Sequence, residues 1–190
     1  MRFLNRKNNF LPKPTTMSQQ TYTIVLLMFH ICTGVFWAGA TIYLAAFVAP
    51  AVKASGAEGT KFMQQLSRTN NLPLWMTLAA TLNVLCGVLL LWKLSDGFQN
   101  HEWMSSKRGM TLSIGGGLAI IAYLEGLFIT RPTVMKVAKL GKAIAAAGGP
   151  PSAEQMQQMM AYRKKIFSAN NFVATLLAAA VIAMSLAKYI

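Results

Sequence analysis

The chain has 190 residues, 54% of them hydrophobic, and a mean hydropathy of +0.42. Its net charge is +13, from 18 Lys and Arg against 5 Asp and Glu. A basic chain can bind nucleic acid through its phosphates. Here the basic residues instead gather at the ends of apolar runs, where lipid headgroups lie. The composition therefore argues against nucleic acid and indicates an integral membrane protein.

The first apolar run, residues 23–50, has no formal charge and contains one histidine, His30. At about 1.5 Å per helical residue it is long enough to cross a bilayer core of about 30 Å. It is also too long for a signal peptide. We expect four membrane spans, at about residues 23–50, 74–92, 110–130 and 172–187.

Residues 1–22 are polar and basic, and we expect them to form a flexible tail, of which residues 1–16 precede a second candidate start at Met17. Residues 23–190 are expected to form a single all-α domain, a four-helix transmembrane bundle. Cys32 and Cys86 lie inside apolar runs, which gives no support for a disulfide framework. Both are interpreted first as packing residues.

Two long polar connections are predicted to contain amphipathic helices. In the first, the spacing of Phe62, Met63 and Leu66 predicts a short interfacial helix. Asn70 and Asn71 can cap the second span, with Pro73 in its first turn. The second connection is expected to have a basic helix ending near Ala147, a Gly-Gly-Pro-Pro break, and a capping box from Ser152 to Gln155. The following helix is expected to present these side chains on one face: Met156, Met159, Met160, Ile166 and Phe167.

The two halves of the chain resemble each other. Pro50 and Pro132 follow the first and third spans, and each half then has a Met-Gln-Gln step and an Asn-Asn pair. This pattern predicts two similar helical hairpins, related as parallel repeats by an axis along the membrane normal.

Ten Lys and Arg residues lie on the side of the two long connections, against eight on the side of the termini. From Met17 onward the comparison is ten against four. The positive-inside rule then places the connections in the cytoplasm, with bacterial inner membrane as the expected location. The basic connections are expected to contact anionic lipid headgroups.

His30 shares a helix face with Gly34, Trp37 and Thr41. Because Gly34 has no side chain, either a neighbouring helix or a flat group such as a porphyrin could approach closely. One interpretation is that His30 bonds a backbone or hydroxyl group of a neighbouring helix, with Gly34 and Ala38 as a packing seam. The alternative is a cofactor site formed by His30, Gly34 and Trp37.

His30, Trp37-Ala38-Gly39 and Tyr43-Leu44 together resemble the first helix of the HemJ-type protoporphyrinogen oxidases and, more loosely, of CopD-like copper-resistance membrane proteins. The resemblance covers about 20 of 190 residues. It implies haem or porphyrin at His30.

Soft Cys, Met and His ligands also suit Cu(I). Counted along their helices, Cys86 and Met184 are expected near the depth of His30. These three residues form a candidate copper site.

Glu125 is the single acidic residue within a predicted span. It could accept a bond from a basic group on an adjacent helix or, with Asn83, couple a proton or ion. The simplest interpretation of Asn83 is an interhelical hydrogen bond.

The sequence favours a non-enzymatic accessory or binding role, as a homo-oligomer or as a component of a membrane complex. The first alternative is a redox or metal-handling protein with haem b or copper at His30. The second is a small ion- or proton-coupled transporter.

Overall fold

The computed structural model describes residues 17–190, and every regular element in that range is helical. Four continuous helical stretches are long and apolar enough to cross a membrane: residues 18–54, 72–94, 107–146 and 153–186. This confirms an all-helical fold with four candidate spans. The expected tail residues 1–16 lie outside the described residues. In chain order the elements are α1 (Met17–Tyr43), η1 (Leu44–Val48), α2 (Ala49–Ala54), α3 (Gly56–Arg68), α4 (Leu72–Leu94), α5 (His101–Ser105), α6 (Lys107–Glu125), η2 (Gly126–Thr130), α7 (Arg131–Ala146) and α8 (Ala153–Leu186).

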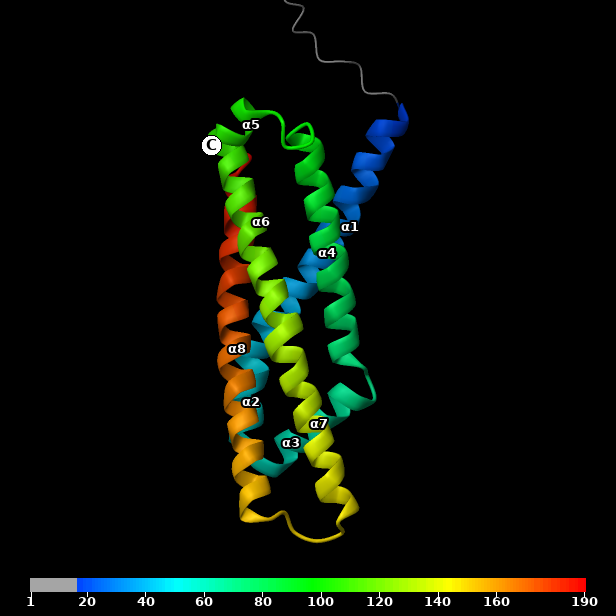
Figure 1. Cartoon of the computed structure of the whole chain (residues 1–190), viewed down its shortest axis with the longest axis vertical. Coiled ribbons are helices and arrows are strands. Elements are labelled where there is room, and N and C mark those ends of the chain that lie inside the picture. Colours follow the sequence, from blue (N-terminus) through cyan, green and yellow to red (C-terminus); the bar gives the residue numbers. More distant parts are fainter. Residues whose placement is uncertain (1–16) are drawn as a thin grey trace, which may run out of the picture.

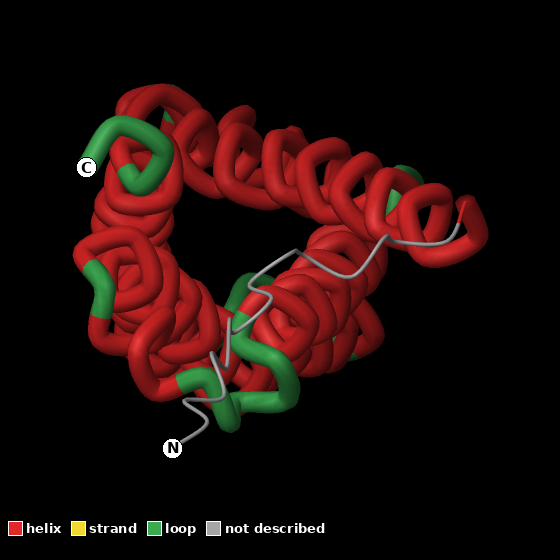
Figure 2. Tube along the Cα trace, turned by 90° about the horizontal axis from the view of Figure 1, so that it is seen from above, coloured by secondary structure: helices red, strands yellow, loops and turns green. Residues whose placement is uncertain are grey.

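The long helices run along one axis, and α1 slants across the others (Figure 1). The most extensive packing is between α1 and α4 and between α6 and α8, while α1 with α8 and α4 with α6 complete the bundle. In the view along the long axis of the molecule, the long helices are arranged around the centre of the bundle (Figure 2). The shared core consists mainly of small side chains, which let the helices approach closely: Trp37, Ala38, Ala79, Ala80, Ala119, Ala122, Val173, Leu177 and Ala180.

The beginning of α1 is tied to the end of α4. Lys93 donates from Nζ to the Gln19 carbonyl at 2.9 Å and to the Thr23 hydroxyl, and it lies 5.7 Å from the centre of the Tyr22 ring. These contacts anchor residues 17–22, which we expected to belong to the tail but which form the first turns of α1.

Two π-helical segments of five residues, η1 and η2, interrupt the α-helical register. Each is followed by a helix with a proline in its first turn, Pro50 in α2 and Pro132 in α7. Proline has no N–H for the carbonyl four residues earlier. The i to i+5 bonds of the two segments join the Ala49 amide to the Leu44 carbonyl and the Arg131 amide to the Gly126 carbonyl, so each ends at the residue before the proline. The two long helices continue through these prolines without a break.

One consequence is that α6, η2 and α7 form a continuous rod of 40 residues, alongside the 34 residues of α8. At about 1.5 Å per residue these rods are about 60 and 51 Å long, far more than the bilayer core of about 30 Å. In Figure 1, α7 continues the line of α6 and moves away from α8 toward the connecting loop, although α7 and α8 still contact each other. We call α7 together with residues 153–165 of α8 the stalk.

The stalk confirms some local expectations and corrects others. The predicted capping box is present, because the Ser152 hydroxyl accepts from the Gln155 amide and the Gln155 side chain accepts from the Ser152 amide. The expected common face of the α8 methionines is wrong. Met159 is buried, whereas Met156 and Met160 are exposed, because the elements packed against α8 cover only one side of it.

The start of α4 also differs from expectation. Asn71 does precede the helix, with Pro73 in the first turn, but its side chain makes no capping bond. Its backbone is left-handed (φ 50°), and its carbonyl accepts the amides of Leu74 and Trp75. The asparagine is therefore used for its tolerance of this conformation, which most side chains avoid.

Candidate functional site

The centre of the α1–α4 contact is a pair of polar side chains, His30 and Asn83. His30 donates from Nδ1 to the Asn83 carbonyl at 2.9 Å, and Asn83 donates from Nδ2 to the His30 carbonyl at 2.7 Å. Asn83 is buried and His30 is half-buried. Each side chain thus bonds the backbone of the other's helix, as expected for Asn83 and for the packing interpretation of His30.

Two glycines make room for this pair. A Cβ on Gly34 would lie 2.7 Å from Asn83 Nδ2, and a Cβ on Gly87 would lie 2.9 Å from His30 Cε1. Gly34 is one turn after His30 on α1, and Gly87 is one turn after Asn83 on α4. The contact is therefore reciprocal: His30 of α1 packs against Gly87 of α4, and Asn83 of α4 packs against Gly34 of α1.

The rest of the predicted α1 face turns toward the bundle. Trp37, Ala38 and Thr41 are all buried, and the Thr41 hydroxyl bonds back to the Trp37 carbonyl at 2.7 Å. Trp37 and Ala38 belong to the shared core. This face therefore packs against neighbouring helices along most of its length.

The hydrogen bonds of His30 determine which of its ring nitrogens is available to bind a ligand. Because Nδ1 donates to a carbonyl, a neutral imidazole has its lone pair on Nε2. A histidine fixed in this way by a carbonyl at Nδ1 is suited to ligate a metal through Nε2. The arrangement serves equally well as a plain interhelical contact.

The three candidate copper ligands have different surroundings. Cys86 is buried on α4, next in sequence to the glycine under His30. Met184 on α8 lies against Gly115 of α6, 3.0 Å from where a Cβ would be. Among residues 17–190, no group of three or more His, Cys, Asp or Glu side chains could hold a metal ion.

Glu125 lies at the junction of α6 and η2. Its two carboxylate oxygens accept from the Thr130 hydroxyl at 3.0 and 3.3 Å, and Lys165 on α8 attracts the carboxylate electrostatically. The i to i+5 spacing fits the wider π turn, which places residues five apart on one side. Glu125 and Asn83, the candidate transport residues, thus each have their own hydrogen-bond partner.

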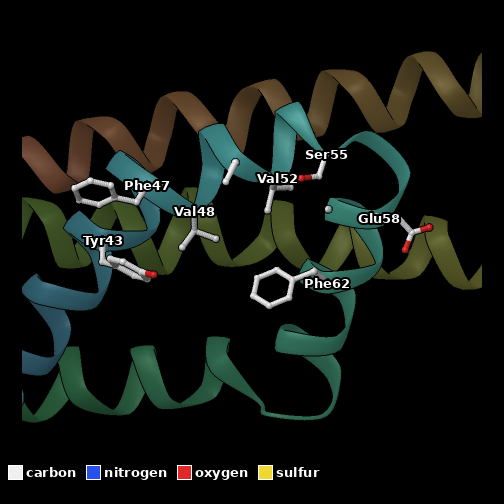
Figure 3. Close-up of a pocket in the computed structure, with 9 residues that line it drawn as sticks. Tyr43, Phe47, Val48, Val52, Ser55, Glu58 and Phe62 are labelled. Carbon is white, nitrogen blue, oxygen red and sulfur yellow. The ribbon is translucent and has the colours of Figure 1, made fainter.

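A groove of about 510 Å³ opens where η1 and α2 meet α3. Figure 3 shows Tyr43, Val48 and Phe62 pointing into this space, while Glu58 points away. The Glu58 carboxylate is paired with Lys61 at 2.8 Å, and both side chains are exposed. The groove offers mainly hydrophobic contact. Its full lining is Tyr43, Phe47, Val48, Ala51, Val52, Ser55, Glu58, Gly59 and Phe62.

The end of the molecule that includes the stalk is strongly basic. In α2, α3, α7 and residues 153–165 of α8, the acidic residues are Glu58 and Glu154 alone. Ten basic residues lie there: Lys53, Lys61, Arg68, Arg131, Lys136, Lys139, Lys142, Arg163, Lys164 and Lys165.

No protein-family model, curated protein or solved structure matches this chain.

Sequence reasoning missed two of the partners in these contacts. Gly87 was missed, although its spacing from Asn83 repeats that of Gly34 from His30. Thr130 was missed because α-helical periodicity places residue i+5 on a different face from residue i. A proline two residues after Thr130 was the available signal for a register change.

Proposed function

We propose that the protein is a non-enzymatic integral membrane component, an accessory or binding subunit that engages other proteins. The observation that carries this proposal is the stalk. Two helices run on beyond the length that a bilayer requires and present basic side chains and exposed methionines. Such a surface suits recognition of a partner in the aqueous compartment.

The polar groups inside the bundle favour the same proposal. His30 bonds with Asn83, and Glu125 bonds with Thr130. Polar residues used in this way hold helices together and fix their register. These contacts therefore support a structural role for the polar groups of the membrane part.

A test is native gel electrophoresis of the protein solubilised from its own membranes in mild detergent. We expect a band larger than that of the purified chain in the same detergent, with other subunits identified in it. The control is the same gel after dissociating detergent, which should yield the single chain. If both preparations migrate together as the isolated chain, the proposal fails.

As a second function we propose binding of haem b or copper at His30, supported by the orientation of its ring. Nδ1 is engaged by the Asn83 carbonyl, which favours Nε2 as the ligating atom. Gly34 and Trp37 would flank a haem, whereas Cys86 and Met184 would complete a copper site. The resemblance to the HemJ-type and CopD-like families is part of this proposal.

The test is a visible spectrum of the purified protein, oxidised and dithionite-reduced, together with metal analysis. A Soret band lost in His30→Ala would support haem, and stoichiometric copper lost in the same variant would support copper. A colourless, metal-free protein after expression with ample haem and copper would contradict this function.

We further propose a bacterial inner-membrane location, with the stalk in the cytoplasm and with basic residues at the membrane edge, such as Arg131 and Lys165, against anionic headgroups. We also propose that the two halves are parallel repeats. In support, each half has a long helix with a π segment two residues before its proline. A cysteine-accessibility assay in intact cells tests the orientation, because single cysteines introduced into the stalk of a variant that lacks Cys32 and Cys86 should react only after the membrane is opened.

A further inference from the structure

We propose that one face of the stalk, formed by Met156, Met160, Arg163 and Lys164, docks an acidic amphipathic helix of a partner protein. This inference rests on the proposed accessory function and names the partner's chemistry and its site. We call these four residues the docking face.

The docking face is a continuous stripe on one side of α8. Met156, Met160 and Arg163 follow each other at spacings of four and three, so they lie one above the other on the helix. Met156 is 46% exposed and Met160 is 57% exposed, whereas Met159, on the side covered by the fold, is 7% exposed. The two exposed thioethers thus form an apolar strip bordered by two cations.

Lipid does not account for this strip. We place the edge of the bilayer core at Lys165, the last basic residue before the apolar part of α8, so Met160 lies about 8 Å and Met156 about 14 Å outside it along the helix axis. The headgroup layer on each side of a bilayer is only about 5–8 Å thick. Met156 therefore lies in water, and an apolar strip there is a feature of interaction sites. Flexible methionines suit such a site because they adapt to the partner's side chains.

The charge of the stalk selects the partner. Within residues 17–190 the one side-chain ion pair is Lys61–Glu58, which lies on α3, so Arg163 and Lys164 have no acidic partner in the described chain. A second copy would bring the same positive charge to this face and be repelled. A helix with acidic residues beside an apolar stripe satisfies both features. Nucleic acid would satisfy the charge alone, because the two methionines have no ring on which bases could stack and the exposed ring on this face, Phe167, lies one turn nearer the membrane than Arg163.

The experiment uses the full chain in nanodiscs of uncharged phosphatidylcholine, so that the lipid does not compete for the stalk. The probe is a fluorescent helical peptide of about 20 residues, with leucines spaced three and four apart and glutamates elsewhere. A scrambled peptide of the same composition keeps the charge but loses the apolar stripe. Binding is followed by fluorescence anisotropy at several salt concentrations.

We expect the amphipathic peptide to bind at least about tenfold more tightly than the scrambled one. Met156→Gln/Met160→Gln should weaken its binding about tenfold, and Arg163→Gln/Lys164→Gln should weaken it and flatten its salt dependence. Lys107→Gln/Arg108→Gln, at the opposite end of the molecule, is the matched control and should bind like the unmodified chain. Circular dichroism should show equal helicity in all four proteins.

Several results would overturn the docking face. One is equal binding of both peptides, or of a single-stranded RNA, with no effect of the methionine changes. Another is no binding at all. The native gel distinguishes failure of the docking face from failure of the proposed accessory function. A large complex that persists in Met156→Gln/Met160→Gln would leave the accessory role standing and remove the docking face, whereas absence of any complex from the unmodified protein would remove the accessory role.

Discussion

His30 and Asn83 each bond the main chain of the helix that carries the other. The Nδ1 donor of His30 meets the Asn83 carbonyl at 2.9 Å, and the Nδ2 donor of Asn83 meets the His30 carbonyl at 2.7 Å. The carbonyl acceptors also fix the amide orientation and the histidine tautomer, since both facing groups must donate. The pair therefore sets the register between α1 and α4 as well as their distance.

Asn83→Leu should destabilise the protein by about 1 kcal/mol, the usual range for an interhelical hydrogen bond in a membrane bundle. Leucine has a similar size but cannot donate to the His30 carbonyl. Unfolding in mixed micelles with increasing dodecyl sulfate measures the change. Asn70→Leu, at an exposed position before α4, is the control and should leave the midpoint unchanged. Equal midpoints for all three proteins would show that the bond contributes nothing.

The glycines under this pair should respond differently from glycines elsewhere in the spans. Gly34→Ala and Gly87→Ala should lower stability, because the new methyl groups press on Asn83 Nδ2 and His30 Cε1. Gly39→Ala and Gly117→Ala meet nothing within 4 Å. They should be neutral or should stabilise the helix by up to about 1 kcal/mol, since alanine is the better helix former. Thermal unfolding in detergent compares the four variants, and a uniform effect would contradict the close approach.

The π segment η2 should set the rotation of the stalk. Deleting Leu127 should convert η2 to a regular α turn and rotate α7 by about 100° relative to α6. Thr133, which is buried, would then turn away from its present surroundings. We expect trypsin to cleave the stalk at Lys136, Lys139 and Lys142 several-fold faster.

Deletion of Gly149, in the loop between α7 and α8, is the matched control for the loss of one residue. It should leave the tryptic cleavage rate close to that of the unmodified protein, because a loop can absorb the change. Fast cleavage after both deletions would mean that the stalk tolerates no shortening anywhere. It would contradict the prediction that η2 sets the rotation of α7 relative to α6.

Ser152→Ala should destabilise the beginning of α8 by about 1 kcal/mol, because it removes the side-chain acceptor for the Gln155 amide. Hydrogen exchange should accelerate about fivefold in the first turns of α8 and stay unchanged in its second half. Ser168→Ala, an exposed serine within the same helix, is the control. Unchanged exchange at the first turns in Ser152→Ala would contradict the capping role.

Much of the fold could be predicted because its signals are local. The apolar runs predicted the membrane-spanning part of each of the four long helices, and Ser152 and Gln155 predicted the start of α8 through a pattern contained in four residues. Asn83 was predicted to bond another helix because a buried amide needs a partner. Its partner, the His30 carbonyl 53 residues away, was not readable from any local pattern.

The sequence by itself determined that the apolar segments suit a membrane, where the helices lie along the chain, and how the charges are distributed. These features depend on hydropathy, proline and capping patterns, which act over a few residues. Only the tertiary structure decided how these parts are used. The long helices continue past Pro50 and Pro132, so a connection expected to be a separate amphipathic helix becomes a stalk on the third span. Packing on one side of α8 then buries Met159 and leaves Met156 and Met160 exposed, a choice that depends on where α7 lies.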